Sequence, residues 1–233
     1  MNHPEHPPSR LPSTLWRRAL VVISLALAAT GTQARHHYTG GGTGEPGRFD
    51  YYVLSLSWAP TYCLTHPDDG AECSGRGYGF VLHGLWPQYD AGGYPENCPS
   101  QFELSAEAVS RGRTIYPSER LLRHEWREHG TCSGLDALGY LRAADRATAS
   151  VRIPPPLEAP PSDQSLTAMQ VIDLFRSANP QMPDHSMTVS CSRGELAEVH
   201  VCLTKDLAVR SCGRGVRTTC PHAAVTLPAF RKR

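Results

Sequence analysis

Alternating apolar and polar positions predict strands in three regions of the chain. The stretch FDYYVLSLSW, from Phe49, carries large apolar side chains on one face of the expected strand, namely Tyr52, Leu54, Leu56 and Trp58. A second stretch, YGFVLHGLWP from Tyr78, predicts a strand that Pro87 ends. Nearer the C-terminus, MTVSC and LAEVHVCLT predict two more strands. In the latter, Val199, Val201 and Leu203 face away from Glu198, His200 and Cys202, so we expect His200 to be structural.

A spacing of three to four residues predicts two helices. Between Pro117 and Gly130, Ser118 can cap the first helix and Gly130 can close it. The second is SLTAMQVIDLFRSAN, with Ser165 as its cap, and the Pro-rich passage IPPPLEAPPSD before it predicts a surface loop. Strands and helices do not alternate regularly, which favours one α+β domain with a central antiparallel sheet over a parallel α/β fold.

The N-terminal 34 residues have the pattern of an export signal. Arg17 and Arg18 precede an apolar run, ALVVISLALAA, and small residues ending at Ala34 suggest a cleavage site. The run is shorter than a membrane-spanning helix needs, which leaves a buried N-terminal helix as the less favoured alternative. Residues 35–47 predict a flexible Gly-rich leader, and residues 48–233 the domain. We therefore expect a periplasmic or secreted protein with no membrane attachment once the signal is removed.

Cysteine content and charge narrow the class of protein further. All eight cysteines lie after the signal, and an even number in an exported chain predicts disulfides, although spacing alone leaves the pairing open. Removal of residues 1–34 would change the formal net charge from +1 to −1, because three arginines and one glutamate are lost. A nearly neutral protein does not hold a polyanion by overall charge, so any contact with nucleic acid should be local to a site.

The stretch HEWREHGTC, from His124 to Cys132, concentrates groups that can exchange protons. On a helix, Glu125 and His129 share one face because they are four residues apart. A zinc protease places two histidines four apart, whereas His124 and His129 are five apart and diverge, so we expect no metal. Acid–base chemistry without a metal needs a second group, and the candidate is His83 in FVLHGLWPQ. A lone strand histidine is more often a core residue, but the helix motif reverses that balance.

HGLWP and HEWREHGTC together resemble the two signature segments of the T2 family of secreted ribonucleases, and the likeness extends from Phe49 to about Pro221. The resemblance implies an α+β fold with packed helices. It also implies four disulfides, which are Cys63–Cys73, Cys98–Cys132, Cys191–Cys220 and Cys202–Cys212. The second of these would tie the end of the HEWREHGTC helix to the loop after HGLWP.

The resemblance further implies an endoribonuclease that cleaves single-stranded RNA through a 2′,3′-cyclic phosphate. His129 would be the base, His83 the acid, and Glu125 a neighbour of the phosphate, with no cofactor. His124 would help to bind the phosphate. DNA lacks the attacking 2′-hydroxyl and should not be cut. His129 ends a helix, whose dipole should raise the pKa of the imidazole unless burial opposes it, so we expect activity on the acidic side of neutral.

One position departs from the family pattern. The lysine that usually precedes the second histidine is replaced by Glu128, whose charge would oppose the transition state unless Arg127 supplies the cation or Glu128 turns away. The alternative is a catalytically weak member that binds RNA or a protein. Family position makes Trp86, Gln88 and Tyr94 candidates for base binding, and we expect broad specificity. We expect Trp58 and Tyr62 to be core residues. We expect a monomer.

Overall fold

The computed structural model describes residues 42–230, so the predicted export signal and residues 35–41 of the leader lie outside the described residues. The last part of the predicted leader belongs to the fold. Strand β1 (Gly42–Thr43) pairs in parallel with β4 (Pro95–Glu96), and the Gly47 amide donates to the Cys132 carbonyl at 2.9 Å. Parts of residues 42–47, which belong to the predicted leader, therefore pair with β4 and hydrogen-bond to Cys132.

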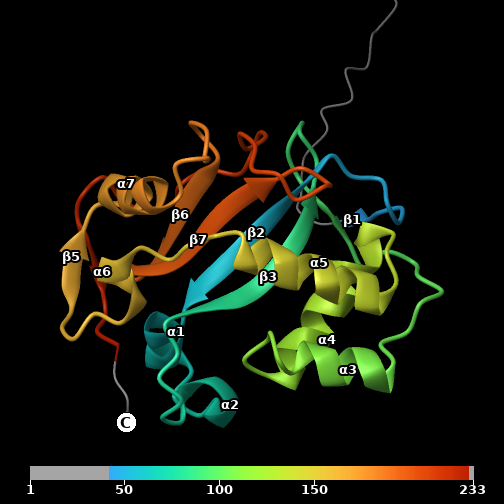
Figure 1. The fold of residues 1–233 in the computed structure, drawn as a ribbon, viewed down its shortest axis with the longest axis horizontal. Coiled ribbons are helices and arrows are strands. Elements are labelled where there is room, and N and C mark those ends of the chain that lie inside the picture. The colour runs from blue at the N-terminus through green and yellow to red at the C-terminus, as the bar shows by residue number, and fades with distance from the viewer. Residues whose placement is uncertain (1–41, 231–233) are drawn as a thin grey trace, which may run out of the picture. The chain divides into compact units, whose positions relative to one another are not determined.

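A six-stranded sheet forms the centre of residues 42–230 (Figure 1). Its order is β3-β2-β7-β8-β5, with β6 also paired to β7. The strands are β2 (Tyr51–Trp58), β3 (Phe80–Gln88), β5 (Gln164–Leu166), β6 (Met187–Ser192), β7 (Glu195–Leu203) and β8 (Val225–Leu227). Neighbours are antiparallel except for a short parallel contact between β7 and β8. The α+β class with a central antiparallel sheet is confirmed.

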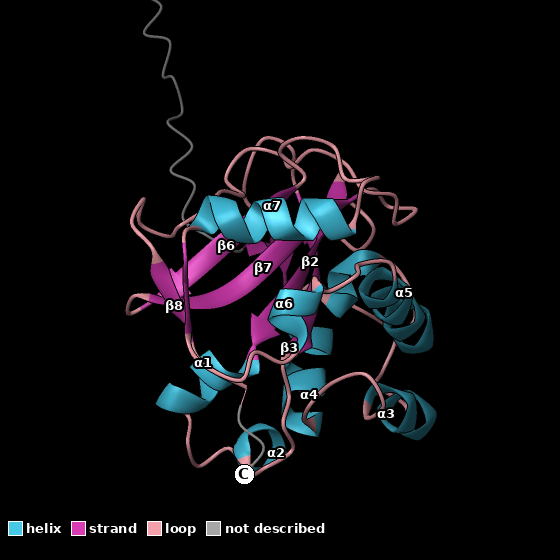
Figure 2. Cartoon of the chain, turned by 60° about the vertical axis from the view of Figure 1, so that its left-hand side comes forward, coloured by secondary structure: helices cyan, strands magenta, loops and turns pink. Residues whose placement is uncertain are grey.

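Seven α-helices and one 3₁₀ helix surround the sheet in the described residues (Figures 1 and 2). The helices are α1 (Ala59–Thr65), α2 (Gly70–Cys73), α3 (Ala106–Gly112), α4 (Glu119–Glu128), the 3₁₀ helix η1 (Gly130–Ser133), α5 (Ala137–Ala149), α6 (Pro155–Glu158) and α7 (Ala168–Ala178). In both views α7 lies across the sheet, and α5 lies beyond its β3 side. No helix in the described part of the chain is long and apolar enough to cross a membrane.

The two faces of the sheet differ as the alternation predicts. Leu54 and Val201 are fully buried in the main core, together with Tyr140 of α5 and Phe175 of α7. The opposite face has only a small apolar cluster, in which Cys202 takes part, and it carries Glu198 and His200 of β7. Polar side chains on this second face are thus held by a rigid sheet without lying in the main core.

Several predicted boundaries are wrong, each for a local reason. Pro87 does not end its strand: β3 runs to Gln88, because an edge strand has one side free of pairing and tolerates a missing amide hydrogen. Ser165 is not a helix cap but part of β5. Thr167 caps α7 instead, where its hydroxyl accepts from the Gln170 amide and the Gln170 side chain accepts from the Thr167 amide.

Two further corrections concern the helix ends and the Pro-rich loop. Ser118 caps α4 as predicted, but the helix stops at His129, and Gly130 opens η1 rather than closing α4. The terminating glycine is Gly134, whose φ of 76° is the left-handed conformation that glycine adopts easily. The Pro-rich passage contains the short helix α6, held by the fully buried side chain of Leu157.

All eight cysteines are paired, and the pairs are Cys63–Cys73, Cys98–Cys132, Cys191–Cys220 and Cys202–Cys212. The resemblance implied this connectivity. Cys98–Cys132 joins the loop after β4 to η1, directly beyond the end of α4. The loop that follows HGLWP and the end of the helix that carries Glu125 are therefore fixed to each other by a covalent bond.

Candidate functional site

His83 is the extra residue of a β-bulge in β3. In the pairing of β3 with β2, Ser55 lies opposite Gly84 and the next residue, Leu56, lies opposite Leu82, which leaves His83 without a partner of its own. A bulge bends its strand locally and changes the direction of a side chain. Leu82 and Leu85 can therefore both enter the core, while His83 is directed to the polar face of the sheet.

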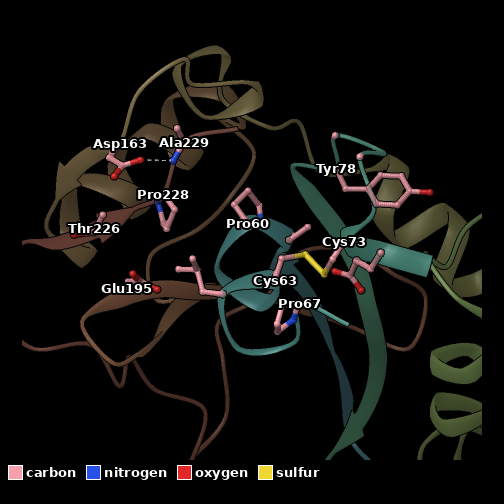
Figure 3. A pocket seen from close by; sticks show the side chains of 15 residues that line it. Pro60, Cys63, Pro67, Cys73, Tyr78, Asp163, Glu195, Thr226, Pro228 and Ala229 are labelled. Atoms are coloured by element: carbon pink, nitrogen blue, oxygen red, sulfur yellow. Dashed lines mark hydrogen bonds between the residues drawn. A yellow bond between two sulfur atoms is a disulfide. The ribbon is translucent and has the colours of Figure 1, made fainter. Parts of the chain in front are cut away.

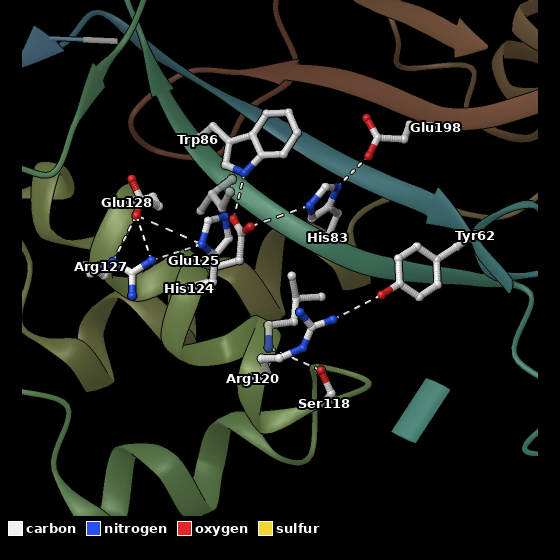
Figure 4. A network of polar contacts seen from close by, with 12 residues as sticks. Tyr62, His83, Trp86, Ser118, Arg120, His124, Glu125, Arg127, Glu128 and Glu198 are labelled. Carbon is white, nitrogen blue, oxygen red and sulfur yellow. Dashed lines mark hydrogen bonds and ion pairs between the residues drawn. The ribbon is translucent and has the colours of Figure 1, made fainter. Parts of the chain in front are cut away.

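The His83 ring lies between two carboxylates, as Figure 4 shows. Its Nδ1 is 2.5 Å from Oε1 of Glu198 on β7, and its Nε2 is 3.6 Å from Oε1 of Glu125 on α4. Burial by itself lowers the pKa of His83, but the hydrogen bond and charge of Glu198 and the charge of Glu125 outweigh it, so this pKa is raised. These neighbours therefore favour the charged, proton-donating form of His83 more than water does for a free imidazole.

Glu125 is almost completely buried, at 1% exposure, and is oriented by Trp86. The indole Nε1 of Trp86 donates to Oε2 of Glu125 at 2.7 Å. Burial raises the pKa of Glu125 to about 7, against the opposing effects of the His83 charge and of the Trp86 hydrogen bond. Gly84 makes room for this contact, because a Cβ there would lie 2.0 Å from Oε2 of Glu125 and 2.2 Å from Nε1 of Trp86.

His129 occupies the opposite electrostatic environment. Burial lowers its pKa to about 4, and the charges of His124 and His83 act in the same direction. Its buried Nδ1 has no hydrogen-bond partner, so protonation there would leave a charged N–H without an acceptor. The exception attached to the helix-dipole prediction therefore applies, since desolvation exceeds the effect of the dipole.

His129 and His83 flank the same indole. The ring centroid of Trp86 is 5.2 Å from that of His83 and 5.4 Å from that of His129. Tyr94 approaches His129 from the other side, with 6.1 Å between the ring centroids. The structure thus brings together His83, Glu125, His129, Trp86 and Tyr94. Gln88, the last residue of β3, is buried.

Glu128 is engaged by two neighbours on one side of α4. Its carboxylate accepts hydrogen bonds from Asn97 Nδ2 and from Arg127 Nε, the latter at 2.9 Å. Arg127 also reaches Nδ1 of His124 at 3.2 Å, and His124 is half exposed. Burial alone would raise the pKa of Glu128, but its bonds to Arg127 and Asn97 lower it, so the carboxylate is charged. The Arg127 guanidinium is therefore partly neutralised by the Glu128 carboxylate.

A cleft of about 610 Å³ opens beside His83. Among its lining residues are Tyr62 and Asp69 from the α1–α2 region, Arg120, His124 and Arg127 from α4, and Glu198. The prediction that Tyr62 is a core residue is therefore wrong. Its side chain is partly exposed and donates to Oδ2 of Asp69 at 2.9 Å. Trp58 is fully buried, as predicted. Glu198 and Arg120 were missed as site residues because only the fold brings them near His83.

A second cavity, of about 290 Å³, lies behind the Cys63–Cys73 disulfide (Figure 3). Pro60 and Tyr78 line one side, and Pro228 and Ala229 the other. None of the residues that the sequence predicts for chemistry lines it. The only group common to both cavities is Glu72 of α2, which is 6% exposed and whose pKa burial raises to about 7. Of the predicted proton-transfer groups, His83 lines the cleft, whereas Glu125 and His129 are not among its lining residues.

A sequence model of the ribonuclease T2 family matches residues 49–212, most of the described chain. The chain belongs to the ribonuclease T2 family. This T2 chain is 52% identical over 122 residues to a ribonuclease of Aeromonas hydrophila, covering 51% of the chain and 52% of that protein. It is 26% identical over 178 residues to a probable ribonuclease of Haemophilus influenzae, covering 70% of this chain and 61% of that protein. The T2 chain therefore spans about half to three fifths of these relatives' lengths.

Solved structures share the T2 fold at lower identity. An RNase-related protein from Calystegia sepium superposes with a TM-score of 0.64 at 23% identity, covering 81% of this T2 chain and all of that one. RNase NT, in a complex with 5′-AMP, gives a TM-score of 0.63 at 23% identity, covering 78% of this chain and 99% of that one. These likenesses show that the arrangement of sheet and helices is that of the family.

Proposed function

We propose that the protein is a metal-independent endoribonuclease that cleaves single-stranded RNA by transesterification. The observation that carries this proposal is the pairing of two histidines with opposite protonation preferences around Trp86. Burial favours the neutral form of His129, while the neighbouring carboxylates favour the charged form of His83. Groups whose pKa values are driven apart in one site are suited to act as base and acid in one reaction.

The reaction requires one proton to be taken and another to be given. Neutral His129 accepts the proton of the ribose 2′-hydroxyl as that oxygen attacks its own phosphorus. Charged His83 donates a proton to the 5′ oxygen as its bond to phosphorus breaks, leaving a 2′,3′-cyclic phosphate and a free 5′-hydroxyl. Glu125, beside the His83 ring, assists by hydrogen bonding to the phosphate when it carries a proton. No cofactor enters these steps.

Binding of the substrate is assigned to residues around this centre. His124 and Arg127, exposed at the rim of the cleft, contact the phosphate. Trp86 and Tyr94 offer aromatic faces for a base, and Gln88 at the end of β3 is a further candidate for base binding. RNase NT was solved with 5′-AMP, which is consistent with a nucleotide in such a site. Aromatic stacking accepts every base, so specificity should be broad.

The wider biological setting follows from chemistry. DNA, which has no 2′-hydroxyl, should remain uncut. Four disulfides form readily only in an oxidising compartment, and with the pattern of residues 1–34 they support export to a periplasm or to the medium. We propose a monomer that carries its whole site on one chain.

Product analysis of dinucleotides tests the activity directly. The oxidised protein is incubated with GpU, ApU and a DNA dinucleotide in the presence of EDTA, and the products are separated by chromatography. We expect cyclic phosphate from the RNA dinucleotides alone, and a loss of at least about 100-fold in His83→Ala, because general acid–base groups contribute about 10² to 10⁴. No cleavage by a folded, oxidised sample would instead favour a binding protein of the same fold.

Glu128→Lys tests the departure from the family pattern. The change removes the anion that occupies Arg127 and places a cation beside the phosphate. We expect kcat to rise by up to about fivefold, since a partly exposed charge is worth up to about 1 kcal/mol. Glu128→Gln is the matched control that removes the anion without adding a cation. An unchanged or lower kcat in Glu128→Lys would mean that Glu128 is not a handicap.

A further inference from the structure

Among the described residues, Glu198 is the only group that fixes Nδ1 of His83. Its strand, β7, is not the neighbour of β3, because β2 lies between them. A separation of two strand spacings is about 9.6 Å, so the two side chains must reach toward each other over β2. Ser55 and Ser57 of β2, opposite His200 and Glu198 in the β7 pairing, are small enough to permit that contact.

The Glu198 carboxylate is itself fixed by a second histidine. Its Oε2 is 2.8 Å from Nε2 of His200, while its Oε1 is the atom that meets Nδ1 of His83. His200 is oriented in turn by a contact of its Nδ1 with the Thr188 hydroxyl, at 3.4 Å. Each oxygen of Glu198 therefore has one imidazole partner, and the carboxylate cannot rotate without losing both.

Resting on the proposed function, we propose that Glu198 is a positioning residue for the reaction: it keeps a proton on Nδ1 of His83 and directs Nε2 toward Glu125 and the leaving oxygen. Because a carboxylate only accepts hydrogen bonds, Nδ1 must be the donor in this contact. The proton that is exchanged during the reaction is then the one on Nε2, the nitrogen 3.6 Å from Glu125. His200, which the sequence analysis assigned to structure, serves the site indirectly by holding Glu198.

The charged groups around His83 support this assignment. Carboxylates approach from three elements, Glu198 on β7, Glu125 on α4 and Glu72 on α2. Of these, Glu125 and Glu72 are buried carboxyls whose own pKa values are raised to about 7, so below that pH they are largely uncharged. The basic groups of the surrounding cleft and of the end of α4 are His66, Arg120, Arg123, His124, Arg127 and His129.

Glu198 differs from the other two carboxyls in remaining charged. Burial by itself would raise the pKa of Glu198, but the hydrogen bonds from His200 and His83 lower it strongly. Throughout the acidic range it is therefore the carboxylate that sustains the charge on His83. Its loss should affect the titration of His83 more than the loss of either neighbour.

The test combines an NMR titration with a pH profile of cleavage. Histidine-labelled protein is compared for wild type, Glu198→Gln and Glu195→Gln, with the His83 signals assigned from His83→Ala. Glu195 lies on the same strand, has no contact with His83 and controls for the lost charge. In Glu198→Gln we expect the His83 pKa to fall by about one unit or more, since a carboxylate partner shifts a neighbour by about 1 to 3 units. The nitrogen shifts should also report loss of the fixed Nδ1 proton.

The same variants are assayed for cyclic phosphate formation from GpU. We expect the alkaline limb of kcat against pH to move to lower pH in Glu198→Gln, with KM changed less than twofold and Glu195→Gln unaltered. An unmoved His83 titration, or an unmoved alkaline limb despite a moved titration, overturns the proposal. If the wild type does not cleave RNA, the proposed function fails, and the titration alone then decides whether Glu198 controls the ring.

Discussion

At the residue scale, the protonation states of His83 and His129 govern the pH dependence that we predict. The base must be neutral, so activity should rise as pH increases through about 4, the pKa of His129. The acid must be charged, so activity should fall as pH increases through the raised pKa of His83, above its ordinary value of about 6.5. A profile of kcat/KM between pH 3.5 and 8.5 should be bell-shaped. An acid limb near pH 6 would contradict the burial of His129.

Gly84 leads to a second residue-scale prediction. Gly84→Ala should lower kcat by at least about 100-fold, because its Cβ would displace Glu125 or Trp86 by an ångström or more and small misplacements carry penalties of that size. Gly70→Ala, where the nearest atom is 3.8 Å from the added Cβ, is the matched control. Circular dichroism verifies that both variants are folded. Equal activity of the two variants would show that the Glu125–Trp86 contact is dispensable.

At the element scale, the Cys98–Cys132 bridge is expected to stabilise the protein more than the Cys63–Cys73 bridge. The first closes a loop of 34 residues and the second one of 10. Loop entropy then gives about 3.8 and about 2.7 kcal/mol, so replacing the cysteine pairs by alanines should lower the free energy of unfolding by amounts that differ by about 1 kcal/mol. Urea unfolding of the two double variants measures this. The reverse order would show that local packing outweighs chain entropy.

The elements also show how far the sequence alone could lead. Alternation predicted β2 and β7 with their correct faces, because each has one face in the main core. The cap of α4 followed from Ser118, since capping depends on neighbours in sequence. The helices α3 and α5 were missed although the sequence signals them: Ser105 and Asp136 cap them, and the buried residues of α5 recur every three to four positions.

Tertiary effects explain what was missed at the site. The contact between His83 and Glu198 joins residues 115 positions apart, and neither their spacing nor their composition indicates it. The direction of the His129 pKa shift stayed open for the same reason: the sequence indicates the helix end, whose dipole raises the pKa, but not the burial that lowers it further. The bulge at His83 had one available signal, a glycine next to it inside an apolar strand.

At the scale of the whole molecule, the balance of charge limits how RNA is held. The chain has 23 basic and 22 acidic residues, and several arginines are engaged by carboxylates, such as Arg120 with Asp69 and Arg210 with Asp90. A molecule with little net charge attracts a polyanion from a distance only weakly. We therefore expect few contacts with phosphate, confined to the basic side chains of the cleft, of which Arg120 and Arg123 are already engaged by carboxylates.

This confinement predicts a weak dependence of cleavage on salt. With about three phosphate contacts, the logarithm of kcat/KM should fall with the logarithm of salt concentration at a slope of about −2, because single strands give about −0.7 per contact. The measurement is kcat/KM between 50 and 300 mM NaCl on a decanucleotide and on GpU. GpU has a single phosphate and should show a slope of about −0.7, whereas the decanucleotide should reach about −2 and no more, because phosphates beyond the cleft meet few cations. A slope steeper than about −4 on the decanucleotide alone would require a basic track outside the cleft and would overturn the view that recognition is local.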